Sequence, residues 1–446
     1  MIWHILKYLL TFSIPSFYRK IQIKNVQYLK NNLPAIIASN HPNAFMDPIA
    51  FSYMVYPPRV RYMARGDAFK PGLISKILES IGIVPIFRMQ DAGTEGVKKN
   101  NESYKVVYSL LKRNKKVMIF AEGICVQEKR LRPIKKGVPR LIFTAQQEIP
   151  DKDILVIPVC LNYSNPSQIG STLFINVGEP FTVKNKMDEY RQNSNATMLQ
   201  MMNELYNKML PLTIHIENPK NDELFEKTRL VLDEVICYQR KLNPENLEHI
   251  FVVEKEISEV IDNLSKNKPT LLENFSEVIS SLYKMIKDYE LDVLTILKSQ
   301  NTSRLVLLFK AVALSIVLIF YNIWYQLVRM IIALPYLLSR YLAKKSSASI
   351  EFYASFFLAY STFIFLFYFL ILFFVLKIFI SPFLVLSGII IVLSSIPLIH
   401  YYPLFRKKVF TLLKILKNKT FALHLSKNIQ QIYKEYEAIQ KLIVEK

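Results

Sequence analysis

Short apolar runs alternate with amphipathic stretches from residue 33 to about residue 178, which is the rhythm of an α/β domain. Runs rich in β-branched and aromatic residues predict strands at 35–39, 117–120, 154–161 and 173–177. Apolar residues at helical spacing predict helices at 72–80 and 101–112. We therefore expect an α/β fold with a mixed sheet covered by helices on at least one face. Pro158 argues against a central, fully paired position for the third predicted strand.

The pattern changes at about residue 188. From there to residue 299 the chain is charged and helical, with heptad-like apolar spacing at 257–264 and 282–297 and no strand-like alternation. These features predict a first domain over 21–187 and a helical extension over 188–300.

The N-terminal segment 2–17 is apolar, but His4 and Lys7 interrupt it and no small-residue cleavage site follows. It predicts an uncleaved helix at the membrane surface over 1–20. At the other end, the residues of 403–446 form a basic amphipathic pattern. This pattern predicts a helical tail that suits either a membrane or a partner.

Two uncharged segments, 352–376 and 378–399, are each long enough to cross a hydrocarbon core of ~30 Å at ~1.5 Å per residue. A third apolar segment, 305–338, contains Lys310 and Arg329, which are costly in mid-bilayer unless they snorkel or pair. Its mode of membrane contact stays open. The region 301–402 is therefore expected to hold two or three hydrophobic helices.

Basic residues flank the two uncharged segments. Arg340, Lys344 and Lys345 precede the first, Arg406, Lys407 and Lys408 follow the second, and only Lys377 lies between them. Because short cytoplasmic loops carry an excess of Lys and Arg, we expect both ends of this pair to face the cytoplasm. A tight turn at 377–382 joins the two segments on the opposite side.

Composition supports a membrane setting. The chain has 57 Lys and Arg against 36 Asp and Glu, a formal charge of +21, which suits phosphate-rich partners such as anionic lipid or phosphorylated metabolites. No zinc-finger spacing, aromatic RNA-binding signature or basic recognition helix favours nucleic acid. The cysteines Cys125, Cys160 and Cys237 are scattered, so neither a disulfide framework nor a cysteine metal site is expected. A reducing, cytoplasmic setting for the first domain follows.

The sharpest candidate for chemistry is the run 40–48, Asn-His-Pro-Asn-Ala-Phe-Met-Asp-Pro, directly after a predicted strand. Acyl transfer to a hydroxyl needs a neutral imidazole to take the proton and a carboxylate on the other ring nitrogen. His41 and Asp47 are candidates for that pair. As alternatives, Asp47 before Pro48 suits a helix N-cap, and His41 by itself suits a loop. No Ser or Cys lies in a nucleophile elbow, which favours direct transfer.

The spacing of His41 and Asp47 sets a geometric condition. On a regular helix at 100° per residue, six positions would place the two side chains about 240° apart. Pro42 also makes a helical path there unfavourable. A loop must therefore bring Asp47 back to His41.

Further motifs follow in order along the chain. They are Gly-Ile-Val-Pro-Ile-Phe-Arg at 82–88, Phe-Ala-Glu-Gly at 120–123, Leu-Arg-Pro-Ile-Lys-Lys-Gly at 131–137 and Val-Ile-Pro-Val at 156–159. Together with the first motif, they resemble the glycerolipid acyltransferase family over about residues 25–181. Five residues separate His41 from Asp47, whereas the common family motif has four. This spacing resembles the variant in fungal glycerol-3-phosphate and dihydroxyacetone-phosphate acyltransferases.

The resemblance implies roles for the downstream residues. Arg88 is expected to bind the acceptor phosphate, and Glu122, at a turn made by Gly123, is expected to contact the acceptor. Ile124 and Cys125 replace a common Thr-Arg pair, so one phosphate contact is lost. The basic residues that are candidates to compensate are Arg130, Arg132, Lys135 and Lys136. For each lysine, a solvated basic face is the alternative.

We therefore expect an integral membrane O-acyltransferase whose catalytic domain lies on the cytoplasmic face and which needs no metal or cofactor. Its donor would be an acyl-CoA or acyl-carrier-protein thioester, and its acceptor glycerol-3-phosphate or dihydroxyacetone phosphate. The alternative acceptor is 1-acyl-glycerol-3-phosphate. A hypothesis of another class is a non-enzymatic membrane scaffold that binds anionic lipid.

Overall fold

A computed structural model of the whole chain describes residues 2–55, 60–65, 82–86 and 89–444. The chain forms two compact units, and each is described by itself. Unit 1 comprises Met1–Thr213 and Tyr341–Thr362, and unit 2 comprises Ile214–Arg340 and Phe363–Lys446. The predicted first boundary at residue 187 falls inside unit 1, because the helices that follow it pack on the sheet of that unit.

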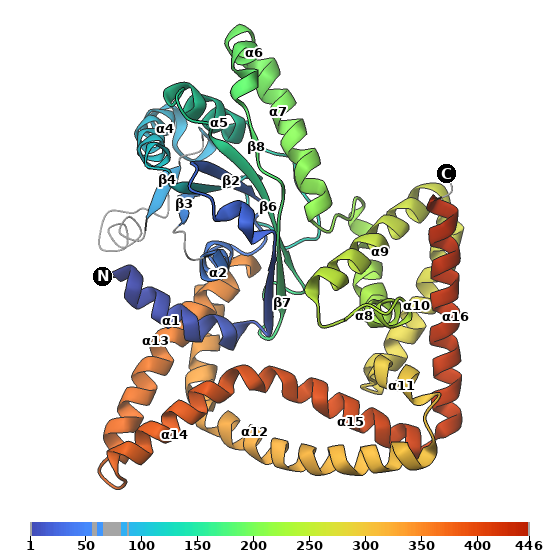
Figure 1. Cartoon of the computed structure of the whole chain (residues 1–446). Coiled ribbons are helices and arrows are strands. Elements are labelled where there is room, and N and C mark those ends of the chain that lie inside the picture. The colour runs from blue at the N-terminus through green and yellow to red at the C-terminus, as the bar shows by residue number, and fades with distance from the viewer. Residues whose placement is uncertain (1, 56–59, 66–81, 87–88, 445–446) are drawn as a thin grey trace. The chain divides into compact units, whose positions relative to one another are not determined.

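Unit 1 is built on a mixed eight-stranded sheet in the order β1-β7-β6-β2-β5-β3-β4, with β8 paired to β6 (Figure 1). All described pairings are parallel except those of β6 with β7 and β8. The mixed sheet expected from the sequence is confirmed. The strands are β1 Lys20–Lys24, β2 Ala35–Ser39, β3 Val60–Arg65, β4 Ile83–Ile86, β5 Lys116–Phe120, β6 Leu155–Tyr163, β7 Thr172–Val177 and β8 Phe181–Thr182.

The four predicted strands are β2, β5, β6 and β7, which form the middle of the sheet. The strands β1, β3 and β4 were not predicted. β1 and β4 are the two edges, where charged residues and proline are tolerated, and they contain Lys20, Lys24 and Pro85. Arg61 and Arg65 similarly interrupt the apolar pattern of β3. Searching for runs of apolar residues therefore finds the buried central strands and misses the strands that contain charged residues or proline.

Pro158 lies in a central strand, contrary to the sequence prediction, but its position is not fully paired, as the sequence predicts. β6 is flanked by β2 on one side and by β7 and β8 on the other. β7 ends at Val177 and β8 begins at Phe181, so the break between them lies opposite Pro158. Gly178 fills the break and donates its N–H to the Pro158 carbonyl over 2.8 Å. This interruption of the ladder accommodates the missing N–H of proline.

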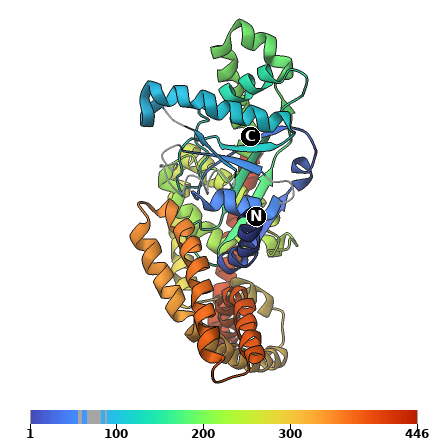
Figure 2. The same ribbon diagram turned by 90° about the vertical axis from the view of Figure 1, so that its left-hand side faces the viewer.

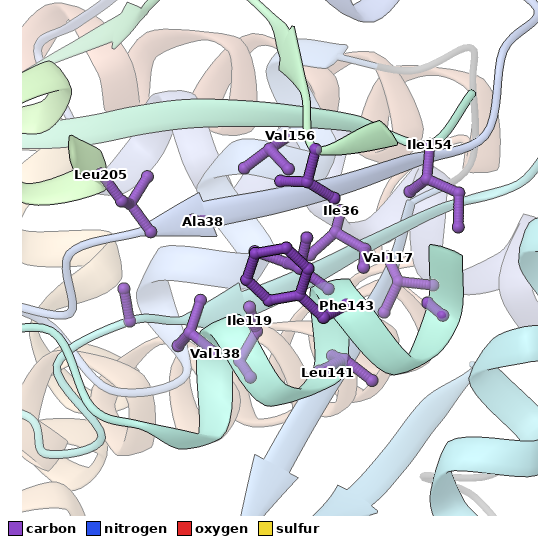
Figure 3. Packing of buried hydrophobic residues seen from close by; sticks show 14 of the residues in the cluster. Ile36, Ala38, Val117, Ile119, Val138, Leu141, Phe143, Ile154, Val156 and Leu205 are labelled. Carbon is purple, nitrogen blue, oxygen red and sulfur yellow. The ribbon is translucent and has the colours of Figure 1, made fainter. Parts of the chain in front are cut away.

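Helices cover the sheet of unit 1. Alternate strand residues such as Ile36, Val117 and Val156 point to one face, where they meet Leu141 and Leu205 (Figure 3). Figure 2 shows α4 lying across the strands on this face. The predicted helix 101–112 is the second half of α4, and the predicted helix 72–80 lies outside the described residues. The helices of this part are α1 Ile2–Phe17, α2 Met46–Val55, α4 Met89–Lys112, α5 Gly137–Glu148, α6 Met187–Gln192 and α7 Ser194–Met209, with the short 3-10 helices η1 Val26–Leu29, η3 Lys184–Lys186 and η4 Leu210–Leu212.

Unit 2 is helical throughout its described residues. Arg240, at the end of α8, donates to Glu256 on α9 over 2.6 Å and to Glu437 on α16 over 2.9 Å, which ties the last helix to the helical extension. Tyr436 on α16 is fully buried. The helices are η5 Pro219–Asn221, α8 Asp222–Gln239, α9 Leu247–Asn267, α10 Pro269–Asp288, α11 Val293–Ser299, α15 Tyr402–Lys417 and α16 Lys419–Val444.

Three helical segments in the described chain are long and apolar enough to cross a membrane. They are α12 Arg304–Ser346, α13 Ile350–Leu376, and α14 Pro382–Ser395 with its continuation through η6 Ile396–Tyr401 into α15. α13 and α14 form a hairpin with its turn at 377–381, as the sequence predicts (Figure 1). Phe365 and Phe369 of α13 and Leu393 of α14 share an apolar cluster with α12.

Candidate active site

Three functional side chains follow the carboxyl ends of three neighbouring parallel strands. His41 comes just after β2, Glu122 just after β5, and Tyr163 is the last residue of β6. The order β6-β2-β5 places these strand ends side by side. In open α/β sheets this edge is where ligands bind, because the side chains of several strand ends converge there.

His41 and Asp47 form the pair expected from the sequence. The Nδ1 atom of His41 lies 2.8 Å from Oδ2 of Asp47. The Asp47 side chain is fully buried, whereas the His41 side chain keeps 19% of its surface exposed. A carboxylate accepts only, so Nδ1 carries the proton and Nε2 carries the free lone pair. The arrangement therefore leaves one ring nitrogen able to accept a proton.

The N-cap alternative for Asp47 is wrong. Asp47 is the second residue of α2, and its carboxylate points back toward the preceding loop. Oδ2 also accepts the N–H of Asn43 over 2.9 Å, and Oδ1 accepts the hydroxyl of Tyr163 over 2.7 Å. The loop turns back through Ala44, which has a left-handed φ of 37°. A loop thus brings Asp47 to His41, as the spacing requires.

Glu122 holds the backbone of the His41 loop. Its Oε2 accepts the N–H of His41 over 3.3 Å, and its Oε1 accepts the N–H of Arg132 over 2.9 Å. Burial raises the pKa of this carboxyl, although the two backbone hydrogen bonds act in the opposite direction. Phe120, two residues earlier, stacks on the imidazole of His41 with ring centroids 3.8 Å apart. Glu122 and Phe120 together fix the position of the imidazole.

Gly123 makes the turn after Glu122 in the left-handed region, with φ 65°. The turn needs glycine for its left-handed conformation, and a Cβ there would also lie 3.1 Å from Cγ of Lys135, so this side chain would have to shift. The N–H of Lys135 bonds to the carbonyl of Ala121 over 2.9 Å. Lys135 and Lys136 expose their side chains just before α5 begins.

The side chain of Arg132 is already engaged. Glu128 accepts from Nε of Arg132 over 2.5 Å and from Nη1 of Arg130 over 3.0 Å. These three residues form one charged cluster next to the Glu122 turn. Arg88, the residue expected to bind phosphate, lies outside the described residues.

Cys125 forms a hydrogen bond with the loop that carries His41. It is unsuited to act as a nucleophile. Its Sγ accepts the N–H of Ala44 over 3.0 Å. Burial and the charge of Asp47 raise the pKa of this thiol, so it stays protonated at neutral pH. Within the described residues, no group of three His, Cys, Asp or Glu side chains is arranged to hold a metal ion.

Tyr163, Asn43 and Tyr18 were not predicted as parts of the site. Asn43 donates from Nδ2 to the hydroxyl of Tyr18 over 3.4 Å, and the rings of Tyr18 and Tyr163 lie 5.9 Å apart. Burial and the charge of Asp47 raise the pKa of both tyrosines, so Tyr163 remains a donor to Asp47. The position of Tyr163 at the carboxyl end of a predicted strand beside the His41 strand was the available signal.

Part of this chain is similar to known proteins. The model of the family named Acyltransferase matches residues 20–162, which include His41, Asp47, Arg88 and Glu122. Glycerol-3-phosphate O-acyltransferase 2 of Saccharomyces cerevisiae is 28% identical over 115 residues, which cover 26% of this chain and 16% of that protein. Among solved structures, the 1-acyl-sn-glycerophosphate (LPA) acyltransferase PlsC of Thermotoga maritima aligns with a TM-score of 0.30 and 13% identity, over 45% of this chain and 79% of that one. Through residues 20–162, this chain therefore matches the Acyltransferase family and is similar to a glycerolipid acyltransferase.

Proposed function

We propose that this chain transfers a fatty acyl group from an acyl thioester to a hydroxyl of glycerol-3-phosphate or dihydroxyacetone phosphate, with His41 as the general base. The observation that carries the proposal is the buried Asp47 carboxylate 2.8 Å from Nδ1 of a partly exposed histidine. This pairing supports the neutral tautomer with Nε2 free, which is the state that a general base needs.

The reaction proceeds by direct transfer. Nε2 of His41 takes the proton of the acceptor hydroxyl while the hydroxyl oxygen attacks the thioester carbonyl carbon. The tetrahedral intermediate collapses by breaking the C–S bond, and the leaving sulfur takes the proton from the imidazolium. An ester and a free thiol result, and His41 is neutral again. The protonated state of Cys125 supports a route without a covalent acyl-enzyme.

Asp47 stabilises the imidazolium that forms during transfer. Its second oxygen is held by the Tyr163 hydroxyl, so the carboxylate keeps its orientation as the charge on His41 changes. Glu122 is proposed to position His41 in addition to its expected contact with the acceptor, because both of its oxygens accept backbone N–H groups.

Acceptor binding is proposed to rest on basic residues around the His41 edge. Arg88, Arg132, Lys135 and Lys136 are the candidates for the phosphate, and a guanidinium suits that task through its paired donors. The preference for glycerol-3-phosphate rests on the spacing of His41 and Asp47 and on the similarity to the yeast protein named above.

The test is a transfer assay with the purified full-length protein. Glycerol-3-phosphate, dihydroxyacetone phosphate and 1-acyl-glycerol-3-phosphate are offered in parallel, each with an acyl-CoA and an acyl-carrier-protein donor. We expect turnover with one of the first two acceptors. Turnover only with 1-acyl-glycerol-3-phosphate would refute the proposed acceptor, and no turnover with any pair would favour the scaffold hypothesis.

The variant His41→Ala tests the proposed base. We expect kcat to fall about 10²- to 10⁴-fold, the usual contribution of a positioned general base, with the thermal midpoint little changed. His249→Ala is the matched control, because His249 on α9 belongs to unit 2 and its ring bonds to the backbone of Asn243. Full turnover by His41→Ala would exclude the assigned role.

A further inference from the structure

α12 carries a continuous exposed apolar stripe along its whole length. The stripe residues recur at intervals of three or four, so they occupy one face roughly 100° wide at 100° per residue. Each of them is exposed, from 44% at Leu338 to 71% at Met330. They are Leu305, Phe309, Val312, Ile316, Phe320, Ile323, Leu327, Met330, Leu334, Leu338 and Tyr341.

The opposite face of α12 packs on protein. Leu318 clusters with Tyr402 and Val409 near α15, and Val328 and Ile332 cluster with residues of α13 and α14. Arg304, Gln326, Arg329 and Arg340 lie between the two faces, along one flank of the helix, by their helical positions. The helix therefore has a protein face, an apolar outer face and a polar flank.

Contacts inside unit 2 restrict how often the chain crosses a membrane. The N–H of Asp292, before α12, bonds to the hydroxyl of Thr411 on α15 over 2.8 Å. Arg240 on the helical extension likewise bonds to Glu437 on α16. The chain before α12 and the chain after α14 thus lie on the same side of any bilayer. An even number of crossings separates them, so the three candidate helices cannot all cross.

Contacts inside unit 1 identify the helix that does not cross. Gln127 donates to the carbonyl of Ile350 at the start of α13 over 3.2 Å. The N–H of Met46, at the start of the helix that carries Asp47, donates to Oγ of Ser355 over 3.1 Å. The junction between α12 and α13 therefore lies on the side of the proposed catalytic site.

The start of α12 lies on that same side. Between the sheet of unit 1 and Arg304, no described helix is long and apolar enough to cross a membrane. Both ends of α12 consequently face one side.

We propose that α12 lies in the plane of the membrane surface, with its apolar stripe in the lipid, and that only the α13–α14 hairpin enters the bilayer. At 43 residues and ~1.5 Å per residue, α12 is ~65 Å long, about twice the hydrocarbon thickness of ~30 Å. An in-plane position also lets the exposed Lys310 and Arg329 reach the headgroups. The partner is thus an anionic lipid surface, which the basic residues at both ends of α12 favour.

The first test measures how deep the apolar stripe of α12 lies in the bilayer. The chain has two tryptophans, Trp3 and Trp324, so a background of Trp3→Phe with Trp324→Phe is free of tryptophan. In this background Ile323→Trp places one indole on the middle of the stripe. Phe367→Trp places one on the exposed face of α13, ten residues or ~15 Å before Lys377, as the matched control. The full-length variants are reconstituted in phosphatidylcholine and phosphatidylglycerol vesicles that contain lipids brominated either near the headgroup or near the chain end.

We expect the indole at position 323 to be quenched more strongly by the shallow bromines and the indole at position 367 by the deep bromines. Deep quenching at position 323 would show that the middle of α12 lies at the bilayer centre, and the absence of quenching would show that the stripe does not meet lipid. Either result overturns the proposal. Shallow quenching at position 367 would refute the proposal that the hairpin enters the bilayer.

The sidedness of the helix ends gives a second, independent measurement. Arg304→Cys and Lys345→Cys in sealed vesicles are labelled with a membrane-impermeant maleimide, with the parent chain and its three cysteines as the background. We expect both added thiols to be labelled from the same side. Labelling from opposite sides would mean that α12 crosses the membrane and would refute the in-plane position.

Discussion

Tyr163 completes the chain of hydrogen bonds that orients His41. Its hydroxyl donates to Oδ1 of Asp47, and Oδ2 of the same carboxylate faces the imidazole. Asp47 is fully buried, so each of its oxygens depends on a protein donor. At the scale of single residues, the site is therefore a network in which His41 is partly exposed and its supporting groups are buried.

Tyr163→Phe removes the hydroxyl that donates to Oδ1 of Asp47, so this buried oxygen loses its hydrogen bond to Tyr163. We expect kcat to fall about tenfold, because an unsatisfied buried acceptor costs ~1–3 kcal/mol and frees the carboxylate to turn. KM for the acceptor should change little, because Tyr163 is expected to position Asp47 and not to bind the acceptor. Tyr53→Phe on the exposed face of α2 is the control. Equal kcat for both variants, measured by steady-state kinetics, would contradict the role of Tyr163.

Glu122 gives a prediction about pH. Burial raises its folded pKa above that of an unfolded glutamate, about 4.3, so the folded protein binds this proton more tightly. The stabilising contribution of the protonated carboxyl is present below the unfolded pKa and is lost as the pH rises through the folded pKa. Relative to Glu122→Gln, the wild type should therefore lose thermal stability as the pH rises above about 4.3. A parallel pH dependence of the two melting temperatures would contradict this prediction.

At the scale of elements, the central strands determine where the site lies. The ends of β6, β2 and β5 are adjacent only because the sheet order departs from the sequence order. Runs of apolar residues predicted these strands, whereas their order depends on pairings between residues more than a hundred positions apart, such as Ala38 with Pro158. The polar edge strand β1 pairs with β7, which a pattern of local hydrophobicity does not reveal.

A substitution of Gly178, which lies at the break opposite Pro158, tests how tightly β6 is packed there. A Cβ on Gly178 would lie 2.7 Å from Leu212 Cδ1 and 2.8 Å from Pro158 Cγ, so Gly178→Ala should cost ~1–3 kcal/mol of folding free energy through overpacking. Gly137→Ala is the matched control, because a Cβ there meets nothing within 4 Å. We expect a lower melting temperature for the first variant only. Equal melting temperatures would mean that the break is less tightly packed than the structure indicates.

At the scale of the whole molecule, basic and apolar surfaces occur together. The formal charge of +21 accompanies three helical segments that are apolar enough to cross a membrane. In the proposed arrangement, which rests on the contacts of Asp292 with Thr411 and of Met46 with Ser355, α12 lies in the membrane plane and only the α13–α14 hairpin enters the bilayer. The proposed cytoplasmic position of the catalytic domain then follows from the excess of Lys and Arg on the side away from Lys377.

The orientation can be measured at the hairpin turn. We expect a thiol introduced as Lys377→Cys to react with an impermeant reagent only from the outer side of the membrane in intact cells. Lys408→Cys on α15 should react only after the cells are opened. Labelling of Lys377→Cys only from the cytoplasmic side would refute the orientation and would favour a hairpin that does not reach the far surface.

Local patterns in the sequence determined the central strands, the charged helical extension, the apolar hairpin and the order of the motifs, because period, length and composition act over neighbouring residues. Tertiary structure alone decided that the Asp47 carboxylate does not cap its helix. It also joined Glu122 to the backbone of His41 and of Arg132, and Tyr163 to Asp47. The local return of Asp47 to His41 was expected from their spacing, but the contacts of Glu122 and Tyr163, like the restriction on α12, join residues far apart in the chain, and no local pattern encodes them.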